Sequence, residues 1–136
     1  MEKVDEGYSL EEHEEGESRH LGAPLRRLEL GRELEEIRRG EAWKKRGHIA
    51  KTLVKYPDLR VVLIAMKKGA NIGEHKTKAR ITIHAVEGRV LVKLDQQTVD
   101  LPAGCLLGAE SSIPHDVEAQ EESAILLTLA WPTKRA

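Results

Sequence analysis

The sequence has no phenylalanine, and aromatic residues make up only 3% of its 136 positions. With 40% hydrophobic residues it still has the apolar side chains for one core, which must be aliphatic. The single cysteine, Cys105, excludes an internal disulfide and a cysteine-based zinc module. No apolar run approaches the roughly 20 residues of a membrane-spanning helix, and the acidic N-terminus lacks the apolar stretch of a secretory signal. We therefore expect a cytoplasmic protein with no membrane partner.

Net charge is also nearly absent, since 22 basic and 23 acidic residues leave a formal charge of −1. Such a balance gives no support for nucleic-acid binding. The charge is uneven, however, because residues 2–20 contain eight acidic and two basic residues, a net of −6. We expect residues 1–22 to form an acidic, solvated tail. The alternative is an arm that folds over a neighbouring subunit or over the basic remainder of the chain.

Residues 23–47 are predicted to contain one N-terminal helix and a linker. The helix is expected over Pro24–Arg39, because proline suits the first turn and Gly40 suits the position after the last. Leucine and isoleucine recur there at helical spacing. This apolar stripe predicts a helix that packs on the outside of the following domain.

Residues 48–136 are predicted to form a β domain. Short runs typical of strands follow one another, separated by glycine, proline and aspartate. Such runs without helical interruption favour an antiparallel sandwich or barrel, and Glu87-Gly88 suggests a hairpin between two of them. The expected strands are 48–56, 60–67, 79–86, 89–94, 97–101, 105–109, 115–119 and 123–131.

The spacing of glycines and histidines in this domain is informative. Five residues separate Gly69 from His75, and Gly88 follows thirteen positions after that histidine. Gly104 precedes His115 by eleven positions. This layout resembles the two motifs of the cupin superfamily, small β-barrels of jelly-roll type. The resemblance covers residues 48–132 and implies a cupin-type antiparallel jelly-roll β-barrel. Together with the helix expected before it, this predicts a mainly β fold with one N-terminal helix.

The resemblance also implies a metal site, but its ligand positions are only half filled. A metal-bearing cupin would bring three histidines and a carboxylate together, whereas this sequence has Thr77 at the second histidine position and Ile81 at the carboxylate position. A divalent transition metal usually takes at least three protein ligands. His75 and His115 alone predict, at most, a weakly held Zn, Ni, Mn or Fe ion. The second motif departs from the family at Glu110, Ser112 and Ala119.

Three functions compete on this basis. The first is a module that binds a small molecule, with or without a weakly held metal, in an apolar interior with few polar groups. The second is a metal-dependent cupin enzyme of dioxygenase or isomerase type. The third is a metal-free enzyme that uses one histidine as a general base. The expected pocket residues are His75, Thr77, Ile81, Ile83 and His115, and no catalytic residue is assigned.

Other features concern the surroundings of this pocket. Strand alternation places His84 on the opposite face from Ile81, at the surface or a subunit contact, and Cys105 is expected to be a small buried hydrophobe. The run Val61–Met66 is apolar on both faces, which predicts cover by the N-terminal helix or by a second subunit. Cupins commonly form dimers, so we expect a homodimer.

Overall fold

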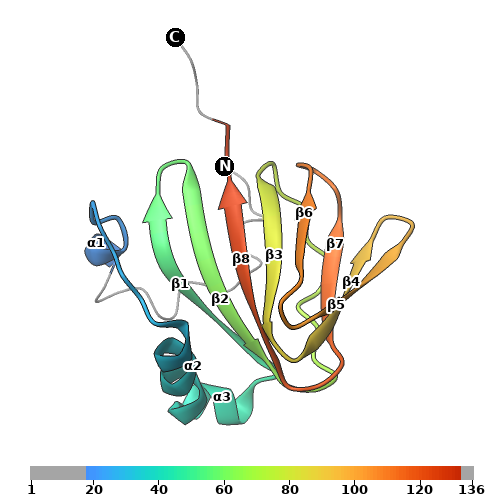
Figure 1. The fold of residues 1–136 in the computed structure, drawn as a ribbon, viewed down its shortest axis with the longest axis horizontal. Helices are drawn as coiled ribbons and strands as arrows, with labels where there is room; N and C mark the ends of the chain where they lie inside the picture. Colours follow the sequence, from blue (N-terminus) through green and yellow to red (C-terminus); the bar gives the residue numbers. More distant parts are fainter. Residues whose placement is uncertain (1–17, 133–136) are drawn as a thin grey trace.

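The computed structural model describes residues 18–132, which form two antiparallel sheets with short helices on one side (Figure 1). The first sheet has the strand order β1-β2-β8-β3-β6 and the second the order β5-β4-β7. None of the helices in this described part is long and apolar enough to cross a membrane. The elements are α1 (Ser18–Leu21), α2 (Leu30–Arg39), α3 (Glu41–Lys45), β1 (His48–Tyr56), β2 (Leu59–Met66), β3 (Arg80–Glu87), β4 (Arg89–Leu94), β5 (Thr98–Pro102), β6 (Leu106–Ala109), β7 (His115–Ala119) and β8 (Ser123–Ala130).

Most of the predicted acidic tail, residues 1–17, lies outside the described residues. The last residues of that predicted segment include the short helix α1, in which Leu21 is 1% exposed. This helix contacts β1. The chain therefore packs against the first strand just before residue 23, where the tail is expected to end.

The main core lies between the two sheets and is aliphatic. In β3 the alternate residues Ile81, Ile83 and Ala85 are buried, and in β4 Val90 and Val92 are buried with them. All five belong to one cluster that also takes in residues of β1, β2, β7 and β8. Strand alternation therefore puts one face of each strand into a shared interior, as the sequence predicts.

A second cluster covers the outer face of the larger sheet. Leu34 and Ile37 of α2 pack with Leu63 and Ala65 of β2. Charged side chains extend this contact, because Lys51 Nζ of β1 lies 2.7 Å from a carboxylate oxygen of Glu33 on α2. The run Val61–Met66 is thus apolar on both faces because β2 packs against the interior on one face and under the helix on the other.

The helix is shorter than the sequence predicts. It begins at Leu30, and residues 24–29 are not helical. Side chains hold this segment along β1, since Arg26 Nε donates to the carbonyl oxygen of Leu53 at 2.9 Å and the Tyr56 hydroxyl donates to that of Ala23 at 2.8 Å. These contacts compete with helix formation over the first six predicted residues.

The predicted hairpin at Glu87-Gly88 is wrong. β3 pairs with β8 and β6, whereas β4 pairs with β5 and β7, so the chain crosses from one sheet to the other at this point. Gly88 makes the crossing with φ of +76°, in the left-handed region that favours glycine. The chain does turn at the predicted position, but the two strands that flank the turn pair with other strands.

Candidate functional site

His75 and His115, forty positions apart in the sequence, lie side by side in the structure. Their backbones form a reciprocal pair of hydrogen bonds, N to O, of 2.8 and 2.9 Å. Their imidazole centroids are 6.3 Å apart with the rings inclined at 65°. His115 begins β7 on the face that carries the buried residue Val117, and its side chain is 1% exposed. The two imidazoles therefore lie together on the interior side of the smaller sheet.

Backbone carbonyls orient both rings. Nε2 of His75 lies 2.8 Å from the carbonyl oxygen of Ile72, and Nδ1 of His115 lies 3.2 Å from that of Ile113. A carbonyl oxygen only accepts, so these nitrogens carry the protons when the rings are neutral. Nδ1 of His75 and Nε2 of His115 then hold the lone pairs. The neutral forms of the two imidazoles are therefore different tautomers.

Burial lowers the pKa of His115, and the positive charge of His75 lowers it further, against the opposing effect of its hydrogen bond to Ile113. Burial also lowers the pKa of His48, the first residue of β1, with a further contribution from His75. Both rings are therefore kept neutral at pH values where an exposed histidine begins to take up a proton. Neutral imidazoles suit hydrogen bonding with a ligand.

These shifts predict that the protein loses stability in acid. The unfolded chain binds protons at His48 and His115 more tightly than the folded chain does, so the free energy of unfolding should fall as the pH drops through the ordinary histidine range near 6.5. Urea titrations at pH 8 and pH 5.5 measure this loss, and His115→Gln should reduce it. The matched variant His84→Gln, on the outer face of β3, controls for the replacement of a histidine by glutamine. An equal pH dependence in the wild type and His115→Gln would contradict the assignment.

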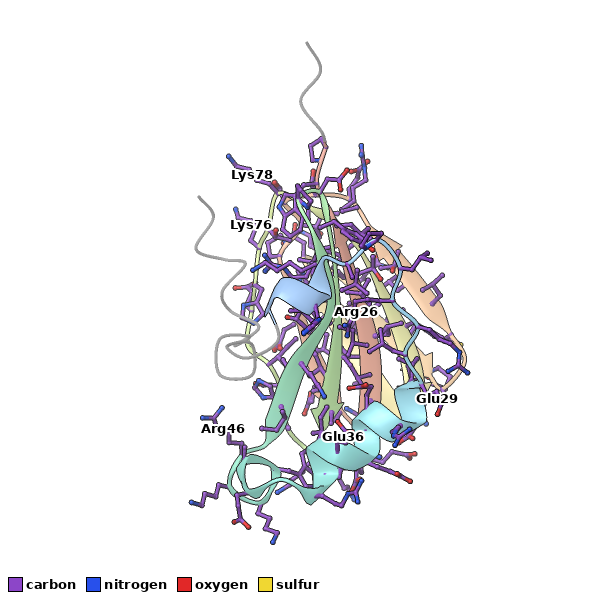
Figure 2. All side chains as sticks on the ribbon, turned by 90° about the vertical axis from the view of Figure 1, so that its left-hand side faces the viewer. Arg26, Glu29, Glu36, Arg46, Lys76 and Lys78 are labelled. Carbon is purple, nitrogen blue, oxygen red and sulfur yellow. The ribbon has the colours of Figure 1, made fainter. Side chains whose placement is uncertain are left out.

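The other predicted pocket residues also face inward. Ile81 and Ile83 are 4% and 1% exposed and belong to the main core. Thr77 is 4% exposed, and its hydroxyl oxygen accepts a hydrogen bond from the backbone N–H of Ala79. Figure 2 shows its neighbours Lys76 and Lys78 extending away from the ribbon, as alternation around an inward-facing Thr77 requires.

The donor set does not fit a cupin metal site. Ile81 has no donor atom, and the Thr77 hydroxyl is a poor ligand when neutral. Within residues 18–132 no group of three histidine, cysteine, aspartate or glutamate side chains is arranged to hold a metal ion. His75 and His115 alone leave a transition metal short of the three protein ligands it usually requires.

Two further side chains, those of His48 and Arg60, face inward, and the sequence analysis does not identify them. His48 pairs with Met66, and it alternates with the buried residues Ala50 and Thr52. The period-two pattern of the run HIAKT is the signal that could have found it. The second group is Arg60 of β2. This strand is apolar on both faces, so its sequence does not show which side chains point inward.

Two predictions about the surroundings have different outcomes. His84 lies on the outer face of β3, as expected, opposite Leu106 of β6. The expectation that Cys105 is buried is wrong, because its side chain is exposed. Cys105 lies in the turn between β5 and β6, and its backbone, not its thiol, makes the structural contacts: the N–H donates to Pro102 and the carbonyl accepts from Ala85.

Comparison with known proteins places this geometry in a family. A family model described as a cupin domain matches residues 62–131. No curated protein matches the chain. Among solved structures, a conserved Streptococcus pyogenes protein of unknown function is 26% identical, with a TM-score of 0.61 over 64% of this chain and 76% of that one.

Two further structures show the same fold at lower identity. KdgF from Halomonas sp. is 22% identical, with a TM-score of 0.60 over 64% of this chain and 82% of that one. A mutant of salicylate 1,2-dioxygenase from Pseudoaminobacter salicylatoxidans is 16% identical, with a TM-score of 0.68 over 81% of this chain but only 36% of that one. The mainly β, jelly-roll-like architecture predicted from the sequence is confirmed, and the chain belongs to the cupin superfamily.

Proposed function

We propose that this cupin binds a small organic molecule between its two sheets, in contact with His75 and His115. The observation that carries the proposal is the pairing of two buried or half-buried imidazoles, 6.3 Å apart, on a mainly aliphatic interior face that has few other polar groups. Small-molecule sites are typically apolar with a few convergent polar groups. Carbonyl contacts hold both rings in a fixed orientation on this face.

A weakly held divalent metal and metal-dependent catalysis are the competing proposals. Solved relatives of this fold include enzymes, the dioxygenase among them. The ligand positions argue against this function here, because two imidazoles hold a transition metal weakly. We therefore expect well below one metal ion per chain in protein purified without an affinity tag or chelator.

One experiment separates these proposals. Wild-type protein is compared with the variant carrying both His75→Ala and His115→Ala and with the matched control His84→Ala. Mass spectrometry identifies small molecules released on denaturation, and elemental analysis measures metal. We expect the wild type and the control to carry a small molecule that the double variant lacks.

Each other outcome has a definite meaning. Equal small-molecule content in all three proteins would contradict the proposed site. Near-stoichiometric metal that the double variant loses would favour the metalloenzyme instead. Metal that persists in the double variant would show that any metal site lies elsewhere.

The homodimer and the cytoplasmic location stay predictions. The outer face of β2, for which the sequence predicts cover by the N-terminal helix or by a second subunit, is covered by α2 within the chain, through Leu34 and Ile37. Among the described residues, the outer face near β6 is uncovered at Leu106, which is 66% exposed beside His84. We propose this face as the dimer contact. Analytical ultracentrifugation tests it, and a mass equal to one chain would contradict it.

A further inference from the structure

Arg60 of β2 faces the same interior as the histidine pair. It lies opposite Leu129 of β8, and Leu129 lies opposite Ile81 of β3. Residues directly opposite one another on paired strands share a face of the sheet. Since Leu129 and Ile81 belong to the core between the sheets, the side chain of Arg60 starts on that inner face. It therefore lies in the same cross-strand row as Ile81, two strands away.

The guanidinium group of Arg60 is incompletely satisfied. Its Nε atom is shielded from solvent and has no hydrogen-bond acceptor within residues 18–132. Its central carbon lies over the Trp131 ring, 5.4 Å from the centroid, and the Trp131 backbone is held by a 3.0 Å hydrogen bond to Asp58. A buried donor without an acceptor is costly and rare in folded proteins.

The positive charge of Arg60 also lacks a carboxylate partner among the described residues. An arginine stays protonated at all physiological pH values, while burial lowers the pKa of His115 and favours its neutral form. No carboxylate of the described residues forms a salt bridge with Arg60, unlike Arg89, whose guanidinium is bonded to Asp100 at 2.8 Å. The fixed positive charge on this inner face is thus Arg60, supported by the Trp131 ring.

We propose that Arg60 binds the carboxylate of an organic acid whose apolar part lies against the aliphatic core and the histidine pair. A guanidinium stacked on an aromatic ring keeps its N–H edge for two parallel hydrogen bonds to a carboxylate. When the side chains that shield Nε move aside for the ligand, the anion supplies the acceptor that Nε lacks. This assignment rests on the proposed function and adds the chemical class of the ligand.

The experiment compares benzoate with benzamide, which has the same shape without the charge. Calorimetry measures both affinities for the wild type, for Arg60→Gln and for the control Lys68→Gln, which removes a positive charge beyond the other end of the same strand. We expect benzoate to bind the wild type and Lys68→Gln about tenfold or more tightly than benzamide, because hydrogen bonds to charged groups are the stronger ones. Arg60→Gln should remove the preference, and Arg60→Lys, which keeps the charge, should retain part of it.

Every other result overturns the assignment in an identifiable way. If benzoate and benzamide bind equally and both are lost in His75→Ala, the interior site stands and the carboxylate class is wrong. If the preference for benzoate survives in Arg60→Gln, the charge that selects it lies elsewhere. If neither probe binds, or if inorganic phosphate displaces benzoate at equal concentration, the assignment to an organic carboxylate fails. A thermal unfolding curve confirms that each variant is folded.

Discussion

Replacing Thr77 with histidine and Ile81 with glutamate should tighten the binding of Zn²⁺ by roughly two orders of magnitude or more. The double change adds two donors beside His75 and His115, which gives the three or more protein ligands that transition metals require. Both positions are buried and face the interior. The glutamate should destabilise the metal-free variant by several kcal/mol, because a carboxylate is then buried without a partner.

Isothermal titration with Zn²⁺ measures this gain, and melting curves give a second readout. Zn²⁺ should raise the melting temperature of the double variant strongly and that of the wild type little. Adding His115→Ala to the double variant should remove most of the gain. If the affinity rises equally without His115, the introduced groups do not converge on the histidine pair.

Replacing Gly88 with alanine should lower the free energy of unfolding by about 3 kcal/mol. The backbone at Gly88 has φ of +76°, which costs an L-residue about 1 kcal/mol or more. A Cβ there would also collide with the Ser123 hydroxyl oxygen and the Glu122 carbonyl oxygen and would lie 2.8 Å from the Ser123 Cα. Two of these atoms are backbone, so relief requires the turn before β8 to move, at about 1–3 kcal/mol.

Gly69 offers a matched control for this steric effect. Its φ is +84°, but a Cβ there meets no atom of the described residues within 4 Å apart from its neighbours along the chain. Gly69→Ala should therefore cost only the backbone contribution, about 1 kcal/mol. Urea titrations of both variants measure the difference, and equal losses of stability would contradict the role of the Gly88 crossing.

The strands are well predicted from the sequence because burial against one core imposes a period of two. The predicted runs at 48–56, 89–94 and 115–119 match β1, β4 and β7 at both ends. Strand pairing is less predictable. A turn such as Glu87-Gly88 shows that the chain reverses, but not whether the next strand stays in the same sheet.

The residues of the candidate site can be predicted from motif spacing where each motif position keeps its backbone conformation, even if the residue type has changed. Ser112, where the second motif departs from the family, illustrates this, because its φ of +66° lies in the left-handed region that favours glycine. The inward direction of the Arg60 side chain cannot be predicted from the sequence. Because β2 is apolar on both faces, the alternation of its residues does not show which face is the inner one. Only the register with Leu129 settles that direction.

The central claim is that His75 and His115 together contact one ligand between the sheets. Long-range nitrogen–proton NMR spectra of the imidazoles, recorded during a titration with benzoate, test it most directly. We predict Nε2–H for His75 and Nδ1–H for His115 before addition, and shifts of both rings on binding while His84 stays constant. Constant signals from both rings at saturation, or a response from His84 instead, would contradict the claim.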